Sequence, residues 1–79
     1  MLLEISVLSP KETVFQGVAK SIILPGEQGA FEVLPFHKRI LSRLIAGNLF
    51  IDGEKFPLRR GVVKVDQNRV TVIIEQNET

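Results

Sequence analysis

His37 is the only imidazole in the chain, so a thiol or hydroxyl triad of the usual kind would depend on it. Nucleophilic catalysis needs a nucleophile, a base and an orienting group within reach of one another. Cysteine is absent, so a serine hydroxyl would have to attack. Ser6, Ser9 and Ser21 are not in the Gly-x-Ser-x-Gly turn that exposes a catalytic serine. A small hydrolase would therefore need His37 for catalysis. The sequence predicts no catalytic residues.

Metal and cofactor sites lack the residues they require. Structural and catalytic zinc take at least three protein ligands, and one histidine with scattered acids does not supply them. The segment 26–29 (GEQG) is too short for a phosphate-binding loop and lacks its Gly-Lys-Ser/Thr ending. Glu27 and Glu32 flank one loop, but their spacing gives no reason for a shared proton. The sequence predicts a protein without metal or cofactor that is not an enzyme.

Basic residues gather in the middle of the chain. Residues 38–60 carry six basic and two acidic side chains, whereas the net charge of all 79 residues is +1. This segment is either a contact patch or an ordinary solvated rim. As a contact patch it allows an alternative function, a free-standing small β-barrel that binds single-stranded nucleic acid. Stacking platforms for bases use exposed aromatic rings, and here the aromatic residues are five phenylalanines, most of them at core positions, so this alternative has weak support.

Apolar residues alternate with polar ones along most of the chain, as in half-buried strands. The pattern predicts strands over residues 3–7, 13–15, 18–24 and 30–34. Pro25 and Gly26 are expected to form the turn that ends the third strand, because proline fixes φ and glycine tolerates positive φ. Short strands at spacings of about 8–12 residues are typical of a sandwich or small barrel.

Two tight hairpins are expected in the second half. Asp52-Gly53 separates strands at 49–51 and 54–56, and Asp-Gly suits a type I′ turn. Gln67-Asn68 separates strands at 63–66 and 69–72. One face of this second hairpin is wholly aliphatic and is predicted to lie in the core: Val63, Val65, Val70, Val72 and Ile74.

Residues 38–45 allow two interpretations. Their apolar positions (40, 41, 44 and 45) have helical spacing, but eight residues make a marginal helix and the neighbouring segments are strands. We favour a strand. The chain is interpreted as a single domain, 1–79, with a thin core and no run long enough to span a bilayer. No signal peptide is expected at its start.

Phe36 follows a proline in a loop and precedes Lys38 and Arg39. A ring at this place either folds back onto the core or serves as an anchor for a partner, since aromatic and arginine residues are enriched at interface hot spots.

The order of these features resembles the N-terminal β-sandwich domain of the epsilon subunit of F-type ATP synthases, the subunit called delta in mitochondria. Residues 3–10 (LEISVLSP) and 14–17 (VFQG) are similar to the family's first strand and its F-x-G step. Residues 25–37 (PGEQGAFEVLPFH) resemble its P-G-x-x-G-x-F-x-x-L-P-x-H signature. Residues 60–72 (RGVVKVDQNRVTV) are similar to its last hairpin.

The resemblance implies a flattened antiparallel β-sandwich of about ten short strands in the rotor of a proton- or sodium-translocating ATP synthase. In that family the domain lies between the gamma subunit and the c ring, at the cytoplasmic face of the inner (plasma) membrane, and is not itself inserted in the bilayer. The loop matching Gln28–Phe31 faces the c ring, and the strand matching His37 and Ser42 faces gamma. The resemblance gives no nucleic-acid partner, and many members carry a C-terminal helical hairpin that these 79 residues lack. The residues expected to bind partners are Gln28, Ala30, Phe31, Phe36, His37, Lys38, Arg39 and Ser42.

Three departures from the family pattern stand out. Lys38-Arg39 replaces the usual Ala-Pro after the histidine, and Phe36 stands where the family has glycine or asparagine. Arg60-Gly61 replaces a pair of glycines before the last hairpin. The first two changes fall in the loop that the resemblance places near partner subunits.

Overall fold

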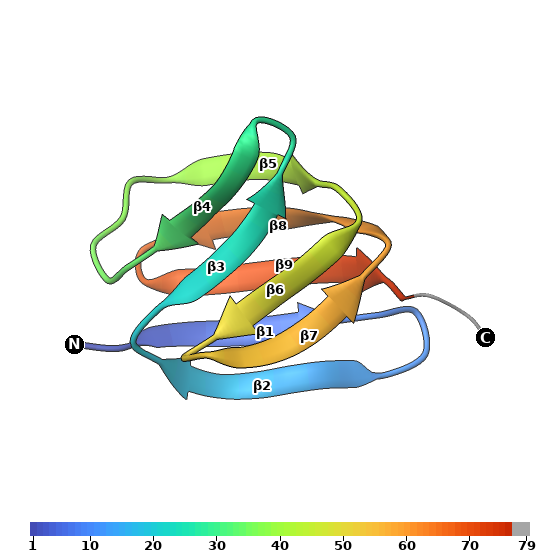
Figure 1. Ribbon diagram of the computed structural model, residues 1–79. Coiled ribbons are helices and arrows are strands. Elements are labelled where there is room, and N and C mark those ends of the chain that lie inside the picture. Colours follow the sequence, from blue (N-terminus) through green and yellow to red (C-terminus); the bar gives the residue numbers. More distant parts are fainter. Residues whose placement is uncertain (77–79) are drawn as a thin grey trace.

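The computed structural model describes residues 1–76 and is all-β, as predicted (Figure 1). Nine strands form one sheet in the order β2-β1-β9-β8-β5-β3-β6-β7, with β4 paired to β3. The strands are β1 Leu3–Leu8, β2 Thr13–Ala19, β3 Ile22–Gly26, β4 Gly29–Val33, β5 Ile40–Leu44, β6 Gly47–Ile51, β7 Glu54–Leu58, β8 Arg60–Asp66 and β9 Arg69–Glu75.

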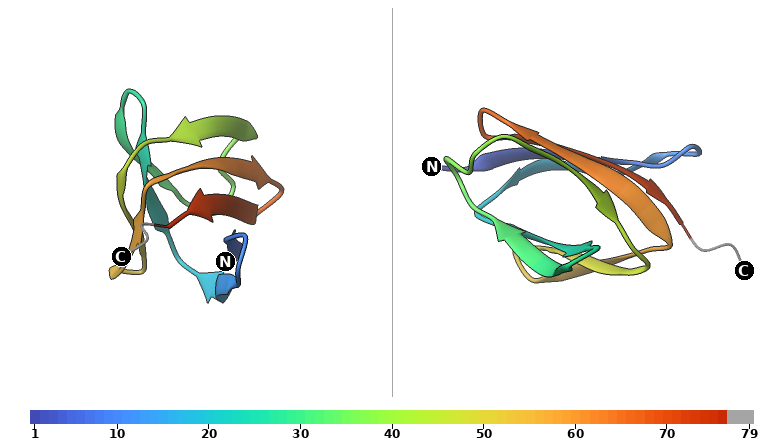
Figure 2. Two further views of the ribbon diagram at one scale, coloured as in Figure 1. Left: turned by 90° about the vertical axis from the view of Figure 1, so that its right-hand side faces the viewer. Right: turned by 90° about the horizontal axis from the view of Figure 1, so that it is seen from above.

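The sheet curls into two layers that face each other (Figure 2). One layer holds β2, β1, β9, β8 and β5, and the other holds β4, β3, β6 and β7. The layers are joined where β3 meets the end of β5: Gly26 pairs with Leu44, and the N–H of Ile45 donates to the carbonyl of Pro25 at 2.9 Å. The expected antiparallel arrangement holds for most neighbours, but β1 pairs with β9 in parallel. A parallel pair needs a long connection between its strands, and here β2 to β8 provide it.

The core lies between the layers and is aliphatic. The predicted inward face of β8 and β9 is confirmed, since Val63 is paired with Val72, Val65 with Val70, and all four are fully buried. At the open side of the sandwich, the rings of Phe15 on β2 and Phe56 on β7 meet edge to face, with centroids 5.7 Å apart. Among the described residues no polar or charged side chain is buried, so burial of apolar surface is the main source of stability.

Both predicted hairpin turns are present. Asp52 (φ 47°) and Gly53 (φ 86°) join β6 to β7, and Gln67 (φ 51°) and Asn68 (φ 63°) join β8 to β9. Positive φ at both central residues is the mark of a type I′ turn. Asp52 also accepts hydrogen bonds from the backbone N–H groups of Lys20 (3.0 Å) and Ser21 (3.0 Å), which fixes the link between β2 and β3.

The prediction of a turn at Pro25-Gly26 was wrong. Both residues belong to β3, where they pair with Ala30 and Gly29, and the chain turns at residues 27–28 instead. The inner side of Gly26 is filled by the Phe31 ring, so glycine is needed there for space rather than for turning. The strand boundaries nearby also differ: β2 runs on through Gly17 to Ala19, and the next strand begins only at Ile22.

Residues 38–45 contain a strand, as we favoured, and not a helix. In β5, Ile40 and Leu44 face the core while Leu41 points to solvent. The helical spacing in the sequence arose because Leu41 and Ile45 are exposed aliphatic residues beside the two inward ones.

Candidate docking surfaces

The predicted partner-binding residues fall into two groups. Gln28, Ala30, Phe31 and Ser42 line one hollow of about 440 Å³ beside the 27–28 turn. Phe31 is partly buried and packs against the core, so it shapes this hollow as well as lining it. This group brings the β3–β4 turn and β5 together.

The second group lies on the segment between β4 and β5, residues 34–39, which we call the 34–39 loop. Phe36 is 74% exposed and has a positive φ of 69°. Its backbone N–H donates to the side-chain oxygen Oδ1 of Asn68 at 2.6 Å. The ring thus does not fold back onto the core, and the first of the two interpretations of Phe36 was wrong.

Neighbouring contacts hold the rest of this loop. The backbone N–H of His37 donates to the carbonyl of Leu34 at 3.1 Å, and His37 Nδ1 donates to the carbonyl of Lys38 at 2.7 Å. Arg39 forms an ion pair with Asp66 at 3.4 Å. The loop is tied to itself and to the β8–β9 hairpin.

The two groups lie at opposite ends of β4 and β5, so the eight predicted residues do not form a single patch. The 27–28 turn is at the top of the view in Figure 1, and the 34–39 loop is at its left. The hydrogen bonds agree, because Gly26 pairs with Leu44 at one end of β5 while Phe36 binds Asn68 beyond the other. The structure therefore offers two separate contact regions.

A third surface was not predicted from the sequence. The outer face of β5, β8 and β9 carries large aliphatic side chains that point to solvent: Leu41 (78% exposed), Val62 (41%) and Ile73 (52%). Val62 and Ile73 are direct cross-strand partners, and Arg43 is the partner of Val62 on the other side. The signal was available in the alternation, since these residues occupy outward positions of strands whose inward positions are already aliphatic.

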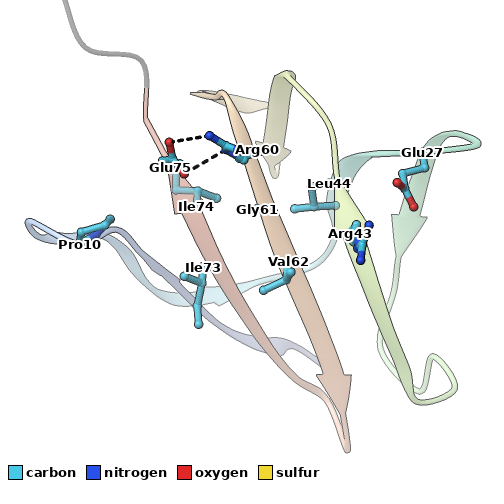
Figure 3. A pocket seen from close by; sticks show the side chains of 10 residues that line it. All are labelled: Pro10, Glu27, Arg43, Leu44, Arg60, Gly61, Val62, Ile73, Ile74 and Glu75. Atoms are coloured by element: carbon cyan, nitrogen blue, oxygen red, sulfur yellow. Dashed lines mark hydrogen bonds and ion pairs between the residues drawn. The ribbon is translucent and has the colours of Figure 1, made fainter.

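Beside these side chains lies an apolar groove of about 470 Å³, which we call the outer groove (Figure 3). Its floor is formed by apolar residues and Gly61, and its rim by charged ones. On the rim, Arg60 binds both carboxylate oxygens of Glu75, at 3.0 and 3.3 Å. The lining residues are Pro10, Glu27, Arg43, Leu44, Arg60, Gly61, Val62, Ile73, Ile74 and Glu75.

The residues considered for catalysis are not brought together. His37 Nδ1 binds a neighbouring carbonyl, while Ser9 binds the backbone of Glu12. Within residues 1–76, no three His, Asp or Glu side chains are grouped as metal ligands would be. No helix in that range could cross a membrane by its length and hydropathy.

The basic segment 38–60 spreads its cations over several elements of the fold. Its cations are divided among the 34–39 loop, β5, β7 and β8, and Arg39, Arg59 and Arg60 are engaged with Asp66 or Glu75. Of the five phenylalanines, Phe36 is the one with an exposed ring, so there is no row of aromatic rings on which bases could stack.

Comparison with known proteins gives one consistent answer. The family described as ATP synthase, Delta/Epsilon chain, beta-sandwich domain matches residues 2–79. The ATP synthase epsilon chain of Nitratiruptor sp. is 38% identical over 78 residues, which cover 92% of this chain and 60% of that protein. The epsilon chain of Sulfurimonas denitrificans is 36% identical with the same coverage. The chain therefore spans 60% of the length of these relatives.

Solved structures show the same fold. A chain in the central stalk/c-ring structure of the Tetrahymena thermophila mitochondrial ATP synthase matches with a TM-score of 0.83 and 15% identity, over 94% of this chain and 63% of that one. A chain of the Euglena gracilis mitochondrial ATP synthase matches with a TM-score of 0.84 and 19% identity, over 92% and 50%.

The fold places the chain in the class of small all-β domains built as a two-layer sandwich. The protein belongs, more particularly, to the β-sandwich domain family of ATP synthase delta and epsilon chains. The resemblance drawn from residues 3–17, 25–37 and 60–72 is confirmed.

Proposed function

We propose that this domain is a rotor component of an F-type ATP synthase that docks the gamma subunit to the c ring and helps to couple ion flow to ATP synthesis. The single observation that carries the proposal is the family match over residues 2–79. The exposed aliphatic residues of β5, β8 and β9 support it, since exposed apolar surface of this kind marks sites of protein contact.

The gamma subunit is assigned to the outer face of β5, β8 and β9 together with the 34–39 loop. Leu41, Val62 and Ile73 provide apolar area there, and Arg43 and Lys38 provide charge. An interface of ordinary size buries about 800 Å² on each partner. This surface includes Phe36, His37, Lys38 and Arg39 from the predicted set.

The c ring is assigned to the opposite end, around the 27–28 turn. Gln28 and Ala30 are exposed there, and the hollow beside them is lined by polar atoms of Glu27 and Ser42. Ser42 lines this hollow and sits on β5, so it lies between the two assigned contact regions. A polar hollow suits the polar loops by which an ion-translocating ring would meet a water-exposed subunit.

The domain does no bond chemistry under this proposal. It transmits torque because it is rigid and is gripped at two ends, and it lies at the cytoplasmic face of the membrane through its partners. The domain is rigid because a single nine-stranded sheet folds over one aliphatic core.

Cross-linking tests this assignment directly, because the chain contains no cysteine and each introduced thiol is unique. Single-cysteine variants at Gln28, Leu41 and Val18 would carry a photoreactive label in a reconstituted complex of gamma, c ring and this chain. We expect the label at position 28 to reach the c ring and the label at 41 to reach gamma. Val18 on β2 serves as the exposed control. Labels at 28 and 41 that reach neither subunit above the Val18 level would contradict the proposed docking.

A further inference from the structure

We propose that Phe36 is a preorganised aromatic anchor that fills an apolar pocket with a carboxylate rim on the gamma subunit. The inference rests on the proposed function and adds the chemistry of the partner's surface. It concerns three residues of the 34–39 loop, Phe36, Lys38 and Arg39.

The first support is the fixed backbone under the ring. Phenylalanine at φ 69° lies in the left-handed region, which is strained for a residue with a Cβ. Such a conformation persists only where the surroundings impose it. Here the 2.6 Å bond from the Phe36 N–H to Asn68 Oδ1 does so, and Asn68 is itself held in the β8–β9 turn. Because the ring is carried on a fixed backbone, little backbone entropy remains to be lost on binding.

The second support is the exposure of the ring and its neighbour. Phe36 is 74% exposed and Leu34, two residues earlier, is 50% exposed. A phenylalanine buries 150–250 Å² when it enters an apolar site, at about 25 cal/mol per Å². Within the described residues nothing covers this pair. An apolar pocket on another chain would remove it from water.

The third support is charge. Lys38 is exposed and makes no ion pair among the described residues. Arg39 contacts Asp66 through its Nε atom alone, and its side chain is still 75% exposed. Both cations lie within three residues of the ring, after His37. A partner pocket edged by Asp or Glu would satisfy them, whereas a basic rim would be repelled.

A matched pair of variants separates the ring from the fold. Phe36→Asn keeps the backbone N–H that binds Asn68 and suits positive φ, so it removes only the ring. Val18→Thr, on β2, alters an exposed aliphatic residue far along the sheet order from β5. Lys38→Glu reverses charge at the loop, and Lys55→Glu on β7 is its charge-matched control.

The experiment is a calorimetric titration of the gamma subunit with the wild-type chain and each variant. We expect Phe36→Asn to weaken binding at least tenfold, and Lys38→Glu several-fold with a greater loss at low salt, because screening reduces charge effects. Val18→Thr and Lys55→Glu should bind as the wild type does. Phe36→Gly provides a second ring-deleted variant and should repeat the result of Phe36→Asn.

The outcomes distinguish the two proposals. Both Phe36 variants are first shown to be folded by circular dichroism. If they bind gamma as tightly as the wild type does, Phe36 is not an anchor, while the proposed docking to gamma is retained. Weakening by the Phe36 variants with no effect of Lys38→Glu would reject the carboxylate rim. If the wild type does not bind gamma at all, gamma is not the partner, and the proposal that Phe36 anchors the domain to gamma is rejected as well.

Discussion

The side-chain oxygen of Asn68 accepts a hydrogen bond from the backbone N–H of Phe36, 32 residues earlier in the chain, at 2.6 Å. Both residues have positive φ, 63° and 69°. The backbone carbonyl of the same asparagine accepts from the N–H of Glu4 at 2.9 Å. Asn68 therefore joins three segments: the start of β1, the 34–39 loop and the β8–β9 turn.

Replacing Asn68 tests this junction. Asn68→Gly keeps the positive φ of the turn but removes the acceptor, and we expect it to lower the free energy of unfolding by about 1–2 kcal/mol. Asn68→Asp keeps an acceptor and should stay within about 0.5 kcal/mol of the wild type. Urea denaturation measures both. Equal stabilities of the glycine and aspartate variants would show that the bond contributes nothing.

Replacing Phe36 should stabilise the free domain. Asparagine tolerates φ near 69°, so Phe36→Asn is expected to raise the free energy of unfolding by about 0.5–1 kcal/mol, as the left-handed strain is relieved and no core contact is lost. Thermal denaturation should show a higher midpoint. A destabilised variant would mean that the ring packs usefully in the free protein. A gain in stability together with a loss of gamma binding would identify a residue kept for contact.

The sequence predicts the all-β class, the two tight hairpins and the type I′ turn at Asp52-Gly53 well, because alternation and Asp-Gly act locally. Val63, Val65, Val70 and Val72 were placed in the core for the same reason. The parallel pairing of β1 with β9 was beyond local pattern, since it depends on how distant segments meet. Pro25 and Gly26 look like a turn in isolation, and only the contact with β4 makes them a strand.

The contact surfaces were predicted less completely than the fold. Phe36 was singled out because a ring after proline is hard to bury, and its exposure agrees. Gln28 and Phe36 lie at opposite ends of β4. The sequence could not show this, because eight residues of separation do not fix the distance between two residues until the conformation of the segment between them is known. Val62 and Ile73 were missed although the alternation places them outward, because an outward valine or isoleucine is common on protein surfaces and does not by itself mark a contact site.

Asp52 should be the most stabilising surface carboxylate. It supports its own turn and accepts the N–H groups of Lys20 and Ser21, and hydrogen bonds to a charged group contribute about 1.5–3 kcal/mol. We expect Asp52→Ala to lower the free energy of unfolding by about 2–3 kcal/mol. Asp52→Asn, which suits the turn and keeps one oxygen acceptor, should cost no more than about 1 kcal/mol. Chemical denaturation gives both values, and an alanine variant as stable as the asparagine variant would contradict the role of these bonds.

Gly61 should resist substitution for a reason of space. A Cβ at this position would collide with the backbone carbonyl oxygen of Ile73 on the neighbouring strand, and backbone cannot move aside as a side chain can. We expect Gly61→Ala to cost about 1–3 kcal/mol. Gly53→Ala is the informative comparison: nothing lies near its added Cβ, and only its φ of 86° opposes the change, at about 1 kcal/mol. If Gly61→Ala proves no more harmful than Gly53→Ala in thermal denaturation, the close approach of β8 and β9 is not as described.

The most direct test is size-exclusion chromatography with multi-angle light scattering on an equimolar mixture of this chain and the gamma subunit at micromolar concentration. The account predicts one peak with the mass of a one-to-one complex, and recovery of the free components when Val62 and Ile73 are both changed to lysine. Separate elution of the wild-type chain and gamma would contradict it.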